Sequence, residues 1–584
     1  MNSATRTYRK RIPYGIMNFE VMRRDDCYYV DKTHFIEEVE LANKFFFFIR
    51  PRRFGKSLLL NMLRHYYDVN EAKHFENLFG GLYIGKHPTR ERNSFLVISL
   101  NFSVIDAGMN NYRRGLDAHC NQKFNLFCDR YRHLLPEGAK EEMNRNEGAV
   151  KQLGYLCDAC MQKGLKIYLF IDEYDHFTNK ILGEPGYLTD YCKETHGEGY
   201  LRLFFDAVKA GTDSAIDRVF VTGVSPVTMD DLTSGFNIGT NYTLDAAFNE
   251  MVGFTEAEVR SMLAYYASVC TFHHTVDELV RLMKPWYDNY CFAENAYGHA
   301  SMYNSNMVLY FIDNYIRNDG QLPKYMVEDN IRMDYNKLRM LIRHDKAFDH
   351  DAKVIEQLVT NGFITGELKK GFPAEMINHP DNFISLLYYF GLITIGGTSR
   401  GKTKFIIPNE VVREQIYAYL LSTYEENDLR TDSYQIGELC SGMAYDGHWQ
   451  PYFQYIADTL KSYASQRDKQ KGEAFVHGFT LALTCQNPFY RPISELDNQA
   501  GYADIFLCPL VDIYADIQHS YIVELKYAKA GDNDKHISQL QQEAQLQVAR
   551  YAASERVKQL LGSTKLHRLV IVFRGTDMAV CEEV

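Results

Sequence analysis

The 584-residue sequence has little tryptophan, no apolar run long enough to cross a bilayer, and no excess of positive charge. It contains 2 Trp against 42 Tyr and 36 Phe, so we expect a core rich in Tyr and Phe. The apolar stretch KFFFFI has the length of a strand, whereas a membrane helix needs roughly 18 apolar residues. The first residues, MNSATRTYRKRIPYG, carry basic side chains without the apolar segment of a signal peptide. These absences predict a cytoplasmic protein without a membrane segment.

The net charge and the cysteine spacing argue against two further features, a surface that wraps nucleic acid and a zinc or redox centre. Asp and Glu (75) outnumber Lys and Arg (64), which gives a net charge of −11 and argues against wholesale wrapping of nucleic acid, though not against a local basic groove. The 12 cysteines form no framework. The close pair Cys157 and Cys160 lacks a second pair or a His-x3-His partner, so buried thiols on a helix fit better than a zinc or redox site.

The length corresponds to roughly three or four domains, and the pattern changes twice along the chain. In residues 1–250, short apolar runs alternate with amphipathic segments. This pattern predicts βαβ units and a doubly wound α/β domain. The apolar runs are those of strands buried on both faces of a parallel sheet: FFFFIR, FLVISLNF, IYLFIDEY and DRVFVTGVSP.

Residues 251–435 have helical periodicity, followed by two strands across a Gly/Ser/Lys turn and another helix, which predicts a helical lid with a winged-helix-like region. The polar stretch around 425–440 is a candidate linker. Residues 436–584 then predict a compact α/β domain, with strands GYADIFLCP, SYIVELKYA and LHRLVIVFRG.

The stretch FFFFIRPRRFGKSLLLNML has the form of a phosphate-binding loop between a strand (45–49) and a helix (57–67). Backbone amides at such a turn bind phosphate, the Lys adds charge and the Ser holds magnesium. Arg50 stands where the motif has its first glycine, and the next residue is a proline without an N–H. The predicted nucleotide-binding residues are Arg53, Phe54, Gly55, Lys56 and Ser57. The alternative is a basic surface turn that opens a helix.

A second element supports the nucleotide site. The strand in KIYLFIDEYDHF ends in Asp172 and Glu173, where a phosphate-loop ATPase places a magnesium-supporting Asp and a water-activating Glu. Asp175 is a weaker candidate, and the alternative is an acidic turn in solvent. The strand RVFVTGVSP ends near Thr222 and Ser225, and Ser225 is a candidate sensor of the γ-phosphate. The predicted magnesium ligands are Ser57 and Asp172.

The last domain carries a second set of polar residues. Glu524 and Lys526 share one face of a strand, because they are two residues apart, and Asp504 lies on the preceding strand. If the strands pair, Asp504 and Glu524 can hold one Mg²⁺, with Lys526 beside it. Glu473 on the helix before and Gln547 on the helix after complete the predicted catalytic set. The alternative is an ordinary solvated strand edge.

The chain resembles bacterial AAA-ATPase-like proteins that carry a C-terminal PD-(D/E)XK nuclease-like domain. The resemblance covers nearly the whole chain and rests on RPRRFGKSLLLNML, LFIDEYD, VFVTGVSP, EAFVHGF, GYADIFL and IVELKYAK. In that family the Arg-Pro-Arg-Arg form of the loop is usual, so Arg50 is a family feature. One departure is Asn289-Tyr290-Cys291-Phe292, where relatives often have Gly-Tyr-Arg-Phe. The resemblance implies a P-loop AAA-like ATPase domain at 1–250 and a nuclease-like domain at 436–584.

These patterns lead to one main hypothesis and two alternatives. The main hypothesis is an ATP- and Mg²⁺-binding ATPase whose nucleotide state controls a Mg²⁺-dependent nuclease-like domain acting on DNA or RNA. The first alternative is an ATP-dependent switch or scaffold whose C-terminal domain binds nucleic acid or a protein without cleaving it. The second is a transcription regulator that uses the winged-helix-like segment. The sequence leaves the oligomeric state open.

Overall fold

The computed structural model describes residues 9–105, 112–176, 199–227, 238–328, 354–355, 357–359, 361–377, 379–426, 431–464, 473–494 and 504–584. For residues 423–426, 463–464, 473–474, 494, 504 and 556 it describes the backbone only. The chain divides into two compact units: an N-terminal unit of 1–321, 327–347 and 365–408, and a C-terminal unit of 322–326, 348–364 and 409–584. The three domain boundaries expected from the sequence stay predictions.

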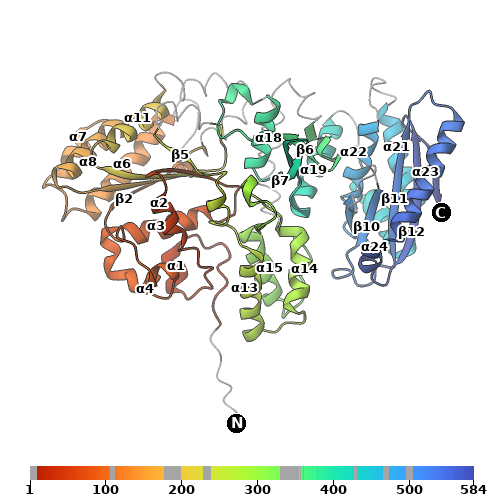
Figure 1. Ribbon diagram of the computed structural model, residues 1–584, viewed down its shortest axis with the longest axis horizontal. Coiled ribbons are helices and arrows are strands. Elements are labelled where there is room, and N and C mark those ends of the chain that lie inside the picture. The colour runs from red at the N-terminus through yellow and green to blue at the C-terminus, as the bar shows by residue number, and fades with distance from the viewer. Residues whose placement is uncertain are drawn as a thin grey trace, which may run out of the picture. The chain divides into compact units, whose positions relative to one another are not determined.

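A five-stranded sheet forms the centre of the N-terminal unit (Figure 1). Its order is β2-β3-β4-β1-β5 and its strands pair in parallel, which confirms the predicted doubly wound α/β arrangement. The six residues of β3 are all buried, as expected of a strand covered on both faces, whereas edge strand β2 alternates buried and half-buried residues. The strands are β1 (Phe45–Ile49), β2 (Leu96–Asn101), β3 (Ile167–Asp172), β4 (Ile216–Gly223) and β5 (Thr240–Asn241).

Helices cover both faces of this sheet (Figure 1). Helix α3 (Lys56–Tyr67), which follows β1, packs over β3 and β2, while α11 (Tyr200–Thr212) packs on α8 (Ala149–Gln162) and on β4. Helix α6 (Tyr112–Arg130) runs along β2. Five shorter helices complete this part: α1 (Phe19–Arg24), α2 (Phe35–Leu41), α4 (Phe75–Phe79), α5 (Tyr83–Lys86) and α7 (Ala139–Arg145).

The rest of the N-terminal unit is mainly helical, as the sequence predicts. Thr255 and Thr275 each close a capping box, with Glu258 and Glu278 three residues on, which fixes where α13 and α14 begin. The predicted hairpin is present: β7 pairs antiparallel with β8 across Arg400 and Gly401, both at positive φ, as a two-residue turn requires. The elements are α13 (Glu256–Val269), α14 (Val276–Tyr287), α15 (Ser305–Arg317), β6 (Ile364–Gly366), α18 (Pro380–Tyr389), β7 (Thr394–Ser399) and β8 (Lys402–Ile406).

A second five-stranded sheet, of order β13-β12-β11-β10-β9, forms the C-terminal unit. The predicted strands and the helix between them are confirmed as β10 (Asp504–Pro509), β11 (His519–Ala528), α23 (Asp534–Ala552) and β12 (Lys565–Arg574). Two strands were not predicted, β9 (Tyr490–Ser494) and β13 (Asp577–Glu583). Both are short or half-exposed outer strands with weak apolar patterns.

Helices α19 (Glu410–Glu426), α21 (Gln450–Ala464), α22 (Glu473–Thr484) and α24 (Glu555–Leu560) belong to the same unit. The polar stretch expected to be a linker is partly helical, because α20 (Ser433–Ser441) begins within it. The carboxylate of Asp432 accepts from the amides of Tyr434 and Gln435 and so caps that helix. The helix arises from this cap and from the burial of Ile436 and Cys440.

Candidate functional site

The turn between β1 and α3 has the backbone of an anion-binding loop. Arg53 and Gly55 both adopt positive φ, at 68° and 98°, and Gly55 is the N-cap of α3. The backbone N–H groups of the first turn therefore point outward from the N-terminus of the helix. This is the positive end of the helix dipole, where binding of phosphate is favourable. A cavity of about 420 Å³ lies over this turn, lined by residues 52–59, Glu173, and an apolar wall that includes Tyr28 and Leu309.

Arg50, at the position of the missing glycine, does not face this cavity. Its guanidinium is 1% exposed and donates to the backbone oxygens of Ile49, Thr243 (2.5 Å) and Phe248 (2.9 Å). The cation also lies 4.2 Å from the ring centre of Phe48. Burial lowers the pKa of Arg50 to about 10, which leaves it charged at neutral pH. Arg50 thus fixes the base of the loop to the segment after β5 and adds no charge at the phosphate side.

Lys56 is also buried, at the first position of α3. Its ammonium donates to the carbonyl oxygens of Arg50 (2.9 Å) and Pro51 (3.0 Å) across the loop. Burial lowers the pKa of Lys56, and the negative charges of Glu173 and Asp172 oppose that shift. If the loop amides held a phosphate, its oxygens would carry more negative charge than these two carbonyl oxygens. They would therefore be stronger acceptors for the ammonium of Lys56.

Ser57 and Asp172 meet at the bottom of the loop. The hydroxyl of Ser57 donates to Oδ2 of Asp172 over 2.8 Å, so the first turn of α3 contacts the end of β3. Burial raises the pKa of Asp172, while the hydrogen bond from Ser57 and the charge of Lys56 oppose the rise. A hydroxyl and a carboxylate side by side are hard oxygen ligands of the kind that Mg²⁺ takes, together with phosphate and water.

Glu173 follows directly and has a strained backbone. Its φ is 53°, in the left-handed region that a glutamate rarely occupies, and its amide donates to Oδ1 of Asp172 at 3.0 Å. Strain of this kind costs of order 1 kcal/mol or more and is found most often at functional sites. The turn directs Glu173 to the wall of the loop cavity, while Asp172 keeps its contact with Ser57.

The polar residues near the end of β4 are occupied within the fold. Thr222 donates to the carbonyl oxygen of Phe48 at 2.6 Å. The carboxylate of Asp175 accepts from the amides of Val224 (3.0 Å) and Ser225 (2.5 Å). The hydroxyl of Ser225 accepts from the amide of Val227, so its role as a sensor of the γ-phosphate stays a prediction.

Phe54, expected to contribute an amide to the phosphate cradle, also anchors the loop through its side chain. Its ring is 1% exposed and packs edge-on against Tyr290 (4.9 Å between centroids) and Phe292 (5.2 Å). The segment in which this chain departs from the family pattern therefore packs on the loop. There the amide of Cys291 donates to the hydroxyl of Thr394 at 2.8 Å.

The second predicted site lies on β10 and β11 of the C-terminal unit. Asp504 stands opposite Glu524 in an antiparallel pair, so the strand pairing on which the predicted site depends is present. The ammonium of Lys526 lies 2.6 Å from Oε1 of Glu524, whose side chain is 0% exposed. Burial raises the pKa of Glu524, and the hydrogen bond and charge of Lys526 oppose that shift. Asp504 and Glu473 are described by their backbone alone.

Further buried polar groups of the C-terminal unit include Gln547 and His477. Among the residues described, Oε1 of Gln547 on α23 and Nε2 of His477 on α22 have no hydrogen-bond partner. Burial and, to a smaller extent, the nearby charge of Lys526 lower the pKa of His477 to about 4. Sequence reasoning missed His477, although it follows Glu473 by one helical turn in the motif EAFVHGF. Among the side chains the structure describes, no three His, Cys, Asp or Glu form a metal-binding group.

Two other expectations concern cysteines and membranes. Cys157 and Cys160 are buried on α8, and burial raises the pKa of each thiol to about 12, as predicted for buried thiols. Across the described ranges, every helix is too short or too polar to span a bilayer.

Comparisons with known proteins match the two parts of the chain that contain these residues. Residues 13–233 match the family described as "Predicted AAA-ATPase", and residues 471–583 match the PD-(D/E)XK nuclease superfamily. The chain therefore contains an AAA-ATPase-like domain and a nuclease-like domain, as the resemblance implied.

Two individual proteins are also similar. One is an uncharacterized protein in the vnfD 5′ region of Azotobacter chroococcum mcd 1, 29% identical over 260 residues. That match spans 44% of this chain and 45% of the relative, so the chain covers less than half of that protein. The other is the crystal structure of Cdc6p from Pyrobaculum aerophilum, at 12% identity and a TM-score of 0.24, over 66% of this chain and 88% of that one. A likeness this weak carries no inference.

Proposed function

We propose that the protein binds and hydrolyses ATP with Mg²⁺, and that its nucleotide state controls a Mg²⁺-dependent nuclease-like domain acting on DNA or RNA. The observation that carries the ATP half is the contact of Ser57 with Asp172 at the base of a loop opened by Gly55. The corresponding domains are 1–250, 251–435 and 436–584.

The geometry of the loop supports the roles that we propose for the first site. The amides of residues 53–57 and the ammonium of Lys56 hold the phosphates, and the hydroxyl of Ser57 with Asp172 holds Mg²⁺. Glu173, on the cavity wall, orients and deprotonates the attacking water. The hydroxyl of Ser225 accepts from the amide of Val227 and keeps its own O–H to donate to the γ-phosphate.

The roles in the second site rest on the register of β10 and β11. Asp504 and Glu524 hold Mg²⁺, and Lys526 stabilises the charge that develops on the phosphate. Glu473 and Gln547 assist from α22 and α23. The described cysteines are free thiols, which supports a reducing compartment, the cytoplasm.

An alternative is supported by a different observation. Glu524 is fully buried and paired with Lys526, and the whole chain carries a charge of −11. Both facts suit a switch or scaffold whose C-terminal domain binds nucleic acid or a protein without cutting it.

The deciding experiment measures ATP binding and nucleic-acid cleavage in one preparation. The full chain is incubated with Mg²⁺ and labelled single- and double-stranded DNA and RNA, with ATP, with ADP and without nucleotide. We expect cleavage whose rate depends on the nucleotide, and its loss in Asp504→Ala. Lys56→Ala should remove ATP binding, whereas the exposed Lys163→Ala should keep it. ATP binding without cleavage of any substrate supports the scaffold, and absence of ATP binding refutes both.

A further inference from the structure

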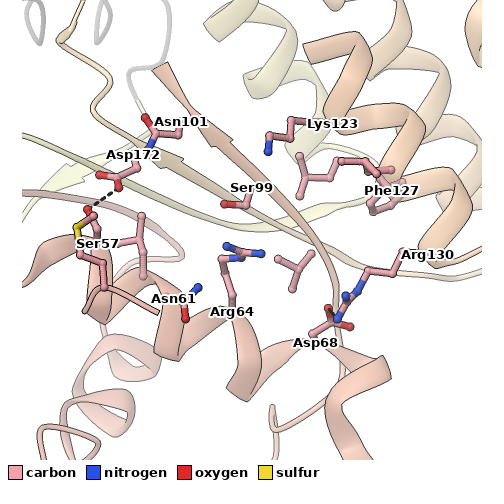
Figure 2. Close-up of a pocket in the computed structure, with 15 residues that line it drawn as sticks. Ser57, Asn61, Arg64, Asp68, Ser99, Asn101, Lys123, Phe127, Arg130 and Asp172 are labelled. Atoms are coloured by element: carbon pink, nitrogen blue, oxygen red, sulfur yellow. Dashed lines mark hydrogen bonds and ion pairs between the residues drawn. The ribbon is translucent and has the colours of Figure 1, made fainter. Parts of the chain in front are cut away.

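A second pocket, of about 540 Å³, lies beside the nucleotide loop (Figure 2). Its walls are α3 and α6, and its floor is the edge strand β2. Among the described residues, Ser57 and Met17 alone line both this pocket and the loop cavity. Ser57 and Asp172 line this pocket but Lys56 and Glu173 do not, so the pocket adjoins the magnesium end of the nucleotide site without including the space around Lys56. We call it the α3–α6 pocket.

The wall formed by α3 is a polar stripe. Ser57, Asn61, Arg64 and Asp68 are spaced by four, three and four residues, so they lie on one side of the helix. A helix packed on a sheet normally carries apolar residues at such positions. The three half-buried residues on one face of β2 are also unusual for a covered strand, since two of them, Ser99 and Asn101, are polar. Both walls thus carry polar side chains at positions where a covered helix or strand normally has apolar core residues.

Arg64 contributes a buried hydrogen-bond donor, its Nε, to this pocket. This Nε has no hydrogen-bond acceptor among the residues described. The nearby carboxylate of Asp68 is taken by Arg130, at 2.7 Å, and Arg130 also binds Glu71 at 2.6 Å. Burial and, to a smaller extent, the positive charge of Arg130 lower the pKa of Arg64, and the carboxylates of Asp68 and Glu71 offset only part of this shift. A guanidinium held in this way is expensive to bury unless an anion compensates it.

Lys123 adds a second cation from the opposite wall. Figure 2 shows Arg64 and Lys123 directed into the pocket from α3 and α6, with Ser99 on the strand between them. Within the part of the chain that the structure describes, Lys123 forms no ion pair with a carboxylate. Apolar side chains of Leu60, Leu126 and Phe127 line the remaining surface. Two cations and a hydroxyl over one space match the charge and the hydrogen-bonding needs of a phosphate group.

We propose that the α3–α6 pocket binds a phosphate group of a ligand other than the nucleotide in the loop, either free phosphate or a phosphomonoester. Arg64 and Lys123 bind the phosphate oxygens, Ser99 and Asn61 donate further hydrogen bonds, and the apolar wall at Phe127 accommodates an organic remainder. The ligand would lie next to Ser57 and Asp172, at the magnesium end of the nucleotide site.

The test titrates inorganic phosphate and phenyl phosphate into the full chain by calorimetry. Mg²⁺ and a non-hydrolysable ATP analogue are present, so that the loop is filled, and the same titrations are repeated in Lys56→Ala without nucleotide. We expect binding in both backgrounds. Arg64→Gln and Lys123→Gln should each weaken it about tenfold or more, since each removes a charged hydrogen bond. Arg114→Gln, an exposed position on α6, is the matched control and should bind as the wild type does.

The outcomes separate the possible sources. Phenyl phosphate binding at least tenfold more tightly than inorganic phosphate supports a phosphomonoester, and equal affinities support free phosphate. The proposal is overturned if neither probe binds, or if Lys123→Gln binds like the wild type. It is also overturned if Arg114→Gln weakens binding as much as the two pocket variants. Because Arg64 is half-buried, thermal unfolding of Arg64→Gln is measured beside its phosphate affinity, and Lys123→Gln decides if Arg64→Gln fails to fold.

Discussion

The hydroxyl of Ser57 donates to Oδ2 of Asp172 over 2.8 Å, which joins the start of α3 to the end of β3. If this pair supports Mg²⁺, Ser57→Ala should reduce the effect of Mg²⁺ on nucleotide affinity. We expect ATP without metal to bind as in the wild type, and MgATP to bind about tenfold more weakly, because one oxygen ligand and its hydrogen bond are lost. Nucleotide titrations with and without Mg²⁺ measure both values. Asp172→Asn should give the same pattern, and a loss that is equal with and without metal would contradict the assignment.

Glu173 provides a prediction that separates binding from hydrolysis. Glu173→Gln keeps the size and the polar end of the side chain but removes the base, so ATP should bind normally while hydrolysis falls about 10²- to 10⁴-fold. Phosphate release at saturating ATP measures the rate, and a fluorescent nucleotide measures binding. A variant that hydrolyses ATP at the wild-type rate would exclude Glu173 as the base.

Arg50 allows a test in which the sequence motif and the structure predict opposite results. Arg50→Gly restores the glycine of the usual phosphate-loop pattern. The buried oxygens of Thr243 and Phe248 then lose their donor, at a cost of about 1–3 kcal/mol each. We therefore expect Arg50→Gly to lower the free energy of unfolding by about 3 kcal/mol, with no gain in ATP affinity.

Thermal or urea unfolding checks this prediction. The matched control is Arg132→Gly, because the Arg132 side chain is 79% exposed and pairs only loosely with Asp129, at 3.7 Å. If Arg50→Gly is as stable as the wild type and binds ATP more tightly, the glycine pattern describes this loop better than the observed anchor does.

The case of Arg50 also shows how far sequence reasoning reaches. The strand at 45–49 and the helix after the loop follow from short-range patterns and were predicted, whereas the pairing of the strands that carry Asp504 and Glu524 entered only as a condition. The direction of the Arg50 side chain was not, because it depends on carbonyls at Thr243 and Phe248, nearly 200 residues away. Long-range contacts of this kind leave no local periodicity.

The α3–α6 pocket was missed for a related reason. The sequence contains Asn61 and Arg64 at helical spacing after Ser57. Without the rest of the fold, this spacing predicts only a solvent-exposed face of the helix. Only the packing of α6 against β2 shows that this face is covered by another element. Lys123 then comes into the same pocket from a helix about 60 residues further along the chain.

A pH effect should arise at His119, which is 7% exposed on α6. Burial lowers the pKa of His119 from 6.5 to about 4, with a further contribution from Lys123, and its Nε2 accepts from the amide of Asn101 at 3.2 Å. The unfolded chain therefore takes up this proton first as the pH falls. The stability that neutral His119 provides is complete above pH 6.5 and is lost on acidification toward pH 4.

The loss can reach about 3 kcal/mol over this interval. His119→Gln keeps an acceptor that does not titrate, so its free energy of unfolding should fall less than that of the wild type between pH 7 and pH 4. The exposed His133→Gln is the control and should follow the wild type. Urea unfolding at several pH values measures the difference, and parallel curves for wild type and His119→Gln would show that His119 is not the titrating group.

The Glu524–Lys526 pair decides how the nuclease-like site should be tested. Removing Lys526 alone leaves the fully buried carboxylate of Glu524 unpaired, and breaking a buried pair in this way costs about 3–5 kcal/mol. Lys526→Met should therefore lower stability as well as any cleavage, and cleavage data from it alone would be ambiguous.

The double variant Glu524→Gln/Lys526→Met removes both charges and should recover most of the stability while staying inactive. Unfolding and cleavage measured on all three chains resolve the two effects. If the double variant is no more stable than Lys526→Met, the two side chains are not coupled. If it is stable and still cleaves like the wild type, the chemistry is not located at this pair.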